Sequence, residues 1–428
     1  MRRFLFPSQL FPTVQWQRNQ FAVTVSASLI FAGFTLVMPF LPLYIQMLGV
    51  PTPAQLAIWA GVVLGISPLL ASVIGPMWGR MADRYGLKIM AIRISLALFL
   101  IWFFTGFAQN VYHLFFLRIL LGIFGGFNTF AISLVTQLCP PEKVGRSIGT
   151  LQATQIFSAA VGPFFGGILA GWIGIRRTFL VTSLMCLISL LLFLRLYKDQ
   201  PLPLKPSASP TPTKRHHSFR NLMLLPNFTM LAILLFVVTT VDRGFAPVIP
   251  LFVMKLTSNA EEAARKAGVI ISLAAFGESF SAWYSGRRIS KVSPKQFLLW
   301  RLTFGGLVCL VLSFAGTVSQ LLWLRVLLAL LAGGTLTIAY TLASQVIPEN
   351  DRAAAFGLLS SFAMLGGAAG PMLGGMLTSV NIRMAFLANT VLYFLLSVLV
   401  YKYVATAFSK GVNDTGSSPQ GTHRRTAP

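Results

Sequence analysis

The chain has 428 residues, of which 55% are hydrophobic and only 10% are charged, and its mean hydropathy is +0.73. A soluble domain of this length needs a far larger share of charged residues on its surface, so the composition excludes a soluble globular protein. The formal net charge of +24 would suggest a nucleic-acid partner in a soluble protein, but here the bases lie between long apolar runs. Composition therefore predicts a membrane protein with no nucleic-acid partner.

Apolar stretches of about twenty residues or more recur along the whole chain, and each is long enough to cross the hydrocarbon core as a helix. They predict an all-α membrane protein with twelve transmembrane helices, in chain order at 21–47, 56–79, 89–108, 112–138, 147–171, 178–197, 227–254, 267–286, 296–315, 321–346, 354–378 and 384–404. The first stretch is too long for a signal peptide and lacks a small-residue cleavage site, so we expect it to remain as the first span. The three cysteines fall in or beside apolar stretches, and no disulfide framework is expected.

The positions of the basic residues predict the orientation of the chain. With the N-terminus inside, most of the 34 Lys and Arg fall in cytoplasmic segments and at cytoplasmic span ends. The predicted outer side holds six of them, namely Arg176, Arg177, Lys255, Arg265, Lys266 and Arg383. Short loops biased in this way follow the positive-inside rule, which places both termini in the cytoplasm of a bacterial inner-membrane protein.

Residues 198–226 interrupt the pattern of apolar spans. The segment is rich in Pro, Ser and Thr, is basic, and has no long apolar run, which is typical of a flexible linker. It divides the chain into an N-terminal six-helix half at 1–197 and a C-terminal six-helix half at 227–404, followed by a disordered cytoplasmic tail at 405–428. The adjacent His216 and His217 are too few to predict a metal site in such a linker.

The two halves are internal repeats offset by about 208 residues. Four elements recur in the same order: Pro39 and Pro42 as Pro247 and Pro250, Arg118 as Arg325, Gly162-Pro163 as Gly370-Pro371, and Phe179 as Phe386. Parallel six-span repeats joined by a linker are typical of transporters in which one half rocks against the other around a central site.

The loop between the second and third spans carries the most specific motif. It reads Gly79-Arg-Met-Ala-Asp83-Arg84-Tyr-Gly86-Leu-Lys88 and resembles the loop signature of the major facilitator superfamily. The glycines permit a tight turn, and Asp83 can accept bonds from a nearby helix N-terminus or arginine, so that breaking the contact would let the halves separate. The alternative is a solvated basic turn that only sets topology.

The fifth span resembles the antiporter signature of the drug:proton antiporter branch of that superfamily. Its small residues and proline share one helix face at Gly149, Ser158, Gly162, Pro163, Gly166 and Gly167. Such a face allows close packing and a bend, and the alternative is generic transmembrane packing. The first span, from Thr35 to Tyr44, is similar to a further motif of the same branch. The resemblance implies a multidrug efflux transporter that acts as a monomer.

Charged residues inside spans are the candidates for proton coupling. Arg118, followed by Gly122 and Gly126, resembles a motif that is implicated in proton coupling in this family, although an arginine near a helix end can also bond backbone carbonyls. Of the ten acids only Asp242 and Glu278 fall inside predicted spans, where desolvation suits a carboxylate to carry a proton. We expect one of them to face Arg118 or Arg243 across a central cavity. The alternative for each is a structural ion pair.

No catalytic constellation and no ATP-binding loop occur in the sequence, so neither an enzyme nor an ATP-driven pump is predicted, and no cofactor or metal is expected. Phe34, Phe40, Phe127 and Phe157 are candidates to line a cavity for lipophilic or cationic molecules. The sequence thus predicts export of small organic, drug-like molecules in exchange for protons by alternating access. A dedicated transporter of one metabolite, such as a siderophore, sugar or peptide fragment, remains the alternative, and a receptor or scaffold is disfavoured.

Overall fold

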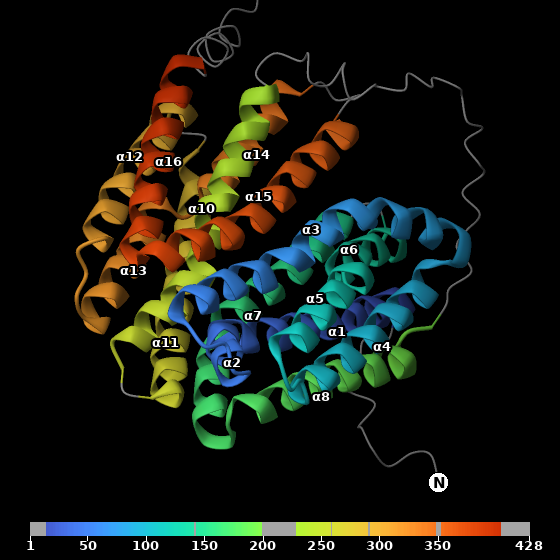
Figure 1. The fold of residues 1–428 in the computed structure, drawn as a ribbon. Coiled ribbons are helices and arrows are strands. Elements are labelled where there is room, and N and C mark those ends of the chain that lie inside the picture. The colour runs from blue at the N-terminus through green and yellow to red at the C-terminus, as the bar shows by residue number, and fades with distance from the viewer. Residues whose placement is uncertain are drawn as a thin grey trace, which may run out of the picture.

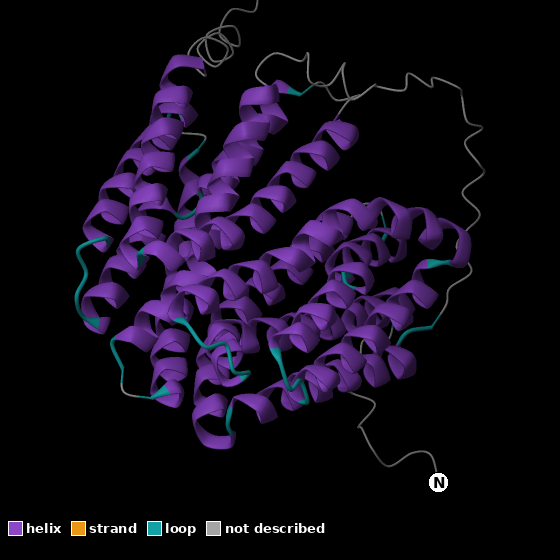
Figure 2. Ribbon diagram, in the orientation of Figure 1, coloured by secondary structure: helices purple, strands orange, loops and turns teal. Residues whose placement is uncertain are grey.

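A computed structural model describes residues 14–140, 143–198, 228–257, 259–289, 292–347 and 352–403. These residues form helices joined by short turns, with no strand among them (Figure 2). The helices of the first part of the chain are α1 (Gln15–Val37), η2 (Met38–Phe40), α2 (Leu41–Met47), α3 (Pro53–Tyr85), α4 (Leu87–Gly106), α5 (Val111–Phe124), α6 (Phe127–Leu138), α7 (Val144–Ile173) and α8 (Ile175–Leu196). Those of the second part are α10 (Phe228–Lys255), α11 (Ala260–Arg288), α12 (Pro294–Leu312), α13 (Val318–Ala332), α14 (Thr335–Val346), α15 (Arg352–Val380) and α16 (Ile382–Tyr403).

The prediction of an all-helical, multi-pass membrane protein is confirmed. Among the described residues, ten helical segments are long and apolar enough to cross a membrane, and Val111–Phe124 is a shorter apolar helix. Two predicted spans fall outside the ten. The predicted span at 112–138 is split into two short helices, and α11 carries Glu261, Glu262, Arg265 and Lys266 near its start and Arg287 and Arg288 at its end.

Glycine pairs divide two of the predicted spans. The span at 112–138 is divided between α5 and α6 at Gly125-Gly126, and the span at 321–346 between α13 and α14 at Gly333-Gly334. Gly126 has a φ of +95° and Gly334 a φ of +76°, a left-handed conformation that residues with a Cβ rarely adopt. Because the breaks occupy matching places in the two repeats, each half contains one helix pair that can bend at a defined point.

Helices that precede residue 197 pack mainly on one another, as do those that follow residue 227. In the first group α1 contacts α7 and α8, and α4 contacts α8, while in the second α10 contacts α15, and α12 contacts α16. The two groups meet chiefly where α3 crosses α15 and where α7 crosses α11 (Figure 1). The axes of α3 and α15 separate from this crossing toward the end of α3 at Tyr85 (Figure 1).

Glycines hold the two groups together at one end of the molecule, which we call the closed end. A Cβ on Gly61 of α3 would lie 2.5 Å from the carbonyl oxygen of Pro371 and 3.1 Å from the Cα of Gly375. A Cβ on Gly268 of α11 would lie 2.5 Å from the carbonyl oxygen of Pro163 in α7. Such backbone-to-backbone approach is possible only with small residues, as in membrane helix interfaces generally.

The centres of the two groups are filled differently. In the first, buried aromatic rings pack together: Trp102 stacks on Phe179 with 6.1 Å between ring centroids, and the Tyr44 hydroxyl donates a 2.7 Å bond to the carbonyl of Thr105. In the second, Phe386 packs with Phe245, and a cavity lies beside this pair. The second group of helices therefore leaves a cavity beside its buried rings.

Candidate functional site

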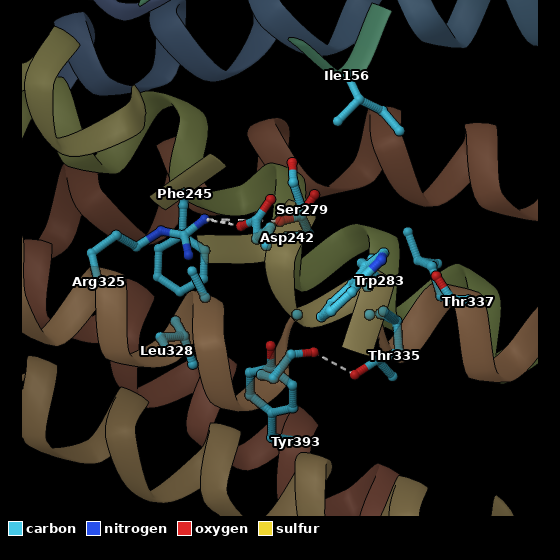
Figure 3. A pocket seen from close by; sticks show the side chains of 18 residues that line it. Ile156, Asp242, Phe245, Ser279, Trp283, Arg325, Leu328, Thr335, Thr337 and Tyr393 are labelled. Carbon is cyan, nitrogen blue, oxygen red and sulfur yellow. Dashed lines mark hydrogen bonds and ion pairs between the residues drawn. The ribbon is translucent and has the colours of Figure 1, made fainter. Parts of the chain in front are cut away.

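A cavity of about 430 Å³ lies among α10, α11, α13 and α14, and Ile156 of α7 reaches its wall from the first group of helices. Its wall includes aromatic and small side chains together with three charged residues (Figure 3). The charged residues are Asp242 of α10, Glu278 of α11 and Arg325 of α13. The volume falls within the usual range for small-molecule sites, and apolar walls with a few charged groups are typical of such sites.

Arg325 is the centre of the charged group. Its Nη2 donates a 2.8 Å hydrogen bond to Oε1 of Glu278 and lies 3.9 Å from Oδ1 of Asp242 (Figure 3). The Arg325 side chain is only 10% exposed, whereas the two carboxylates are about one third exposed, at 36% for Asp242 and 35% for Glu278. One buried guanidinium therefore serves two carboxylates that reach the cavity.

The ring of Phe245 packs against the Arg325 guanidinium. The Arg325 guanidinium carbon lies 4.9 Å from the Phe245 ring centroid, within the range of a cation–π contact. The Nε atom of Arg243 lies 3.7 Å from Oδ2 of Asp242. The Arg243 side chain is 66% exposed, so solvent screens this ion pair and the pair contributes little to stability. Protonation of Asp242 or Glu278 would change the net charge around Arg325, where α10, α11 and α13 meet.

The glycine break of α13 and α14 adjoins this charged group. A Cβ on Gly333 would lie 3.1 Å from the Cα of Glu278, and one on Gly334 would lie 2.9 Å from the Cα of Ala282. The break thus lets α11 approach closely, which brings Glu278 to the wall that Arg325 also faces. Glu278 therefore lies at the point where the predicted tenth span is divided.

Arg118 lies elsewhere than the sequence led us to expect. Its side chain is buried in the first group of helices, with the guanidinium carbon 4.9 Å from the ring centroid of Trp102 and Nη2 without a hydrogen-bond partner. No ion pair joins it to Asp242 or Glu278 among the described residues. Arg325, its counterpart in the second repeat, takes that place instead. The sequence marks Arg325 only as the repeat of Arg118, because the partner of a buried arginine depends on helix packing.

The predicted cavity aromatics are mostly packing residues. Phe40 is fully buried, Phe127 is 5% exposed, and Phe34 packs edge-on against Trp102 at 6.1 Å. Phe157 is exposed on α7 beside Ile156, but none of the four lines the 430 Å³ cavity. Its aromatic wall comes instead from Phe245, Trp283 and Tyr393, which no motif marked in the sequence.

The antiporter-like motif on α7 lies between α1 and α11. Gly162 and Gly166 face α1, where a Cβ at either position would meet Thr35 or Leu36. Gly167 faces α11, where a Cβ would lie 3.1 Å from the Cα of Arg265. The motif's other members are also described: the Ser158 hydroxyl donates a 3.3 Å bond to the carbonyl of Ser28, Pro163 lies within α7, and Gly149 has open space around it. The motif residues pack against both groups of helices.

The loop motif is described in part. Gly86, with a φ of +86°, joins α3 to α4, and the Arg84 guanidinium lies 5.4 Å from the Tyr85 ring centroid. Lys88 lies 5.8 Å from the ring centroid of Tyr197. The side chain of Asp83 and the surroundings of Gly79 lie outside the described part of the chain, as do nearly all of the segment 198–226 and the tail 405–428. The roles predicted for the motif therefore stay predictions.

Comparison with known proteins identifies the family. The model of the Major Facilitator Superfamily matches residues 23–316 and 231–426. The chain belongs to the major facilitator superfamily. Multidrug resistance protein MdtG of Salmonella paratyphi C is 32% identical over 366 residues, which cover 86% of this chain and 90% of the relative. MdtG of Escherichia fergusonii is 31% identical over 388 residues, covering 90% and 93%.

Solved transporter structures share the fold. A bacterial homolog of the human lysosomal transporter Spinster, in an inward-facing and unoccupied conformation, aligns with a TM-score of 0.77 at 18% identity and covers 93% of this chain and 98% of that one. The nucleoside transporter NupG aligns with a TM-score of 0.71 at 11% identity, covering 90% and 98%. These likenesses establish a major facilitator fold for the described helices.

Proposed function

We propose that the protein exports small organic, drug-like molecules that are lipophilic or cationic across the bacterial inner membrane in exchange for protons. The observation that carries the proposal is the sharing of Arg325 by Asp242 and Glu278 at the wall of the 430 Å³ cavity. The multidrug resistance proteins that are 31–32% identical to this chain over most of its length support the substrate class.

The charged group suits an exchange of a proton for a cation. Two carboxylates face one buried guanidinium, so a cationic substrate in the cavity can bind to the carboxylate that Arg325 satisfies least, Asp242 at 3.9 Å. The ring of Trp283 is 51% exposed at the cavity wall and has the Arg287 guanidinium carbon 4.3 Å from its centroid, so a substrate cation would take the opposite face of the ring. A proton on the carboxylate removes the charge that holds the substrate, so the two ligands compete.

Movement of the two halves would carry the site from one side to the other. We place twelve spans in two six-helix halves joined by the linker at 198–226, with both termini in the cytoplasm and the chain acting as a monomer. In this orientation the closed end faces outward, and the separation of α3 from α15 opens toward the cytoplasm (Figure 1). Protonation of Glu278 would release Arg325 and, through Gly333, alter the bend between α13 and α14.

Transport by reconstituted vesicles tests the proposal. Wild-type protein should accumulate a lipophilic cationic dye against its gradient when a pH gradient is imposed, with a matching flux of protons. Asp242→Asn and Glu278→Gln should each lose uphill accumulation but keep downhill exchange. Glu261→Gln is the matched control, since Glu261 is exposed at the start of α11 and lies outside the cavity.

Two outcomes would overturn the proposal. Full coupled transport by the Asp242→Asn, Glu278→Gln double variant would show that neither acid carries the proton. Failure of wild-type protein to move any compound of a broad cationic panel, together with transport of a single metabolite, would favour a dedicated transporter instead.

A further inference from the structure

A second cavity, of about 450 Å³, lies on the other side of α11 and α13 from the charged site, and α12 forms its third wall. Five aromatic side chains and one arginine shape it: Phe280, Tyr284, Phe297, Trp300, Phe304 and Arg301. Trp300 is 62% exposed and Phe280 is 57% exposed, so the cavity opens on the outer surface of the helix bundle. In a membrane protein that surface faces lipid. We call this cavity the aromatic crevice.

Arg301 lines the aromatic crevice as a buried cation without a counter-charge. It is 6% exposed, and its Nη1 donates hydrogen bonds to the Ser281 hydroxyl at 2.7 Å and to the carbonyls of Leu331 and Gly333. Its Nε has no hydrogen-bond partner, and no carboxylate of the described residues pairs with it. An uncompensated charge near membrane depth is costly, so an anion beside Arg301 would be stabilised.

Basic residues far outnumber acidic ones in the sequence that forms the aromatic crevice. Glu278 is the only acid between residues 263 and 348, and it faces the other cavity, where it binds Arg325. Arg287 and Arg288 lie exposed at the last turn of α11, and the Arg288 guanidinium lies 5.5 Å from the ring centroid of Tyr284, a crevice residue. Arg301 lies seven residues beyond the start of α12 at Pro294, about 10 Å along the helix.

The related arginines of the two repeats lie against different aromatic rings, since the Arg301 guanidinium carbon is 4.6 Å from the ring centroid of Phe297 in its own helix. Arg93, 208 residues before Arg301, has its guanidinium carbon 3.4 Å from the ring centroid of Trp78. Positions 207 and 208 residues after Trp78 hold the small residues Ser285 and Gly286, and a Cβ on Gly286 would meet nothing within 4 Å. The second repeat thus has small side chains at the positions related to Trp78, and the ring nearest its buried arginine comes from another position.

We propose that the aromatic crevice binds one anionic phospholipid of the surrounding bilayer. The phosphodiester lies between Arg301 and the exposed Arg288, and an acyl chain runs along the rings of Phe280, Trp300 and Phe304. The occupant combines a negative headgroup, which the bases require, with a long apolar chain, which the exposed rings require. A free phosphate would leave the rings uncovered, and a lipid without net charge would leave the positive charge of Arg301 and Arg288 uncompensated.

Native mass spectrometry of the purified full-length protein tests this binding without any transport measurement. Protein mixed with phosphatidylglycerol should retain one molecule, and protein mixed with phosphatidylcholine of the same chains should retain about tenfold less or none, because the choline cation would lie among Arg301 and Arg288 and cancel the charge of the phosphate. Arg301→Gln should reduce phosphatidylglycerol retention about tenfold. Arg93→Gln, the matched variant of the first repeat, should retain it as the wild type does.

A second variant keeps the test decisive if Arg301→Gln does not fold. Trp300→Ala removes the exposed wall of the aromatic crevice and keeps the Arg301 bonds to Ser281 and Gly333. It should lower retention several-fold, while the melting temperature in lipid-free detergent stays unchanged. Equal retention of phosphatidylglycerol and phosphatidylcholine by the wild type would overturn the proposal, as would full retention by Trp300→Ala. Retention of a neutral lipophilic dye in place of the lipid would identify a lateral drug entrance and would also overturn it.

Discussion

Ser272 of α11 places its hydroxyl inside the main-chain hydrogen-bond ladder of α7, next to Phe164. Its Oγ accepts a 3.1 Å bond from the Phe164 amide and donates one to the carbonyl of Ala160, two groups that would otherwise bond to each other within the helix. Pro163 lies between them in the sequence, and Ser272 is 2% exposed. A single hydroxyl therefore links the two groups of helices at the closed end.

Replacing Ser272 with alanine should weaken the closed end. The Ala160 carbonyl and Phe164 amide can then bond within α7, so the fold persists, while the two groups of helices lose a contact of about 1 kcal/mol. We expect the population with a separated closed end to rise about fivefold, measured by electron spin resonance distances between labels on α7 and α11. Ser361→Ala removes a hydroxyl that bonds only within α15, to Gly357, and should leave the distances unchanged.

Gly268→Ala should have a larger effect at the same interface. Its Cβ would lie 2.5 Å from the carbonyl oxygen of Pro163, so α7 and α11 must move apart, at a cost of about 1–3 kcal/mol. The expected result is loss of the closed-end population and slow transport, with membrane insertion intact. Gly171→Ala on α7 is the control, because a Cβ there meets nothing within 4 Å. Equal transport by both variants would show that close packing at Gly268 is dispensable.

Arg325→Gln should destabilise the protein through the charges that it leaves behind. Glu278 and Asp242 would then face the cavity without their shared cation, at a cost of about 3 kcal/mol, the low end for a broken buried pair because both carboxylates are a third exposed. The Arg325→Gln, Glu278→Gln double variant should recover part of the lost melting temperature. Arg243→Gln, at an exposed position, should change it little. Additive effects of the two changes would show that the pair is uncoupled.

The two glycine breaks should differ in their tolerance of alanine. Gly126→Ala introduces only the strain of a positive φ, about 1–2 kcal/mol, because a Cβ there meets nothing within 4 Å. Gly334→Ala adds clashes, since its Cβ would lie 2.6 Å from the Ser285 hydroxyl and 2.9 Å from the Cα of Ala282. Thermal unfolding in detergent should therefore show a clearly lower midpoint for Gly334→Ala. The opposite order would mean that the break near Glu278 relaxes more readily than its packing indicates.

Local patterns were sufficient to predict the helical membrane fold. Each span needs about twenty apolar residues whatever its neighbours are, so hydropathy alone places most of them within a few residues of the helices observed. The structure also agrees with the repeat offset, because Arg118 and Arg325 lie equally far from the starts of α5 and α13. The breaks at Gly125-Gly126 and Gly333-Gly334 were missed, because a glycine pair inside an apolar run does not by itself show that the helix ends there.

The sequence by itself determined which residues are candidates, because a chain with ten acids leaves only Asp242 and Glu278 inside apolar spans. Only the tertiary structure decided what each of them faces. Asp242, Glu278 and Arg325 lie on three different helices, and their 2.8 Å and 3.9 Å contacts depend on helix rotation and on the close approach at Gly333. The tertiary structure also decided the surroundings of Phe34, Phe40 and Phe127, which pack within the first group of helices and do not line the cavity. Hydropathy depends on each residue alone, so the sequence is enough to locate the spans. The partner of a charged residue depends on contacts between helices that are far apart in the chain, so only the folded structure shows it.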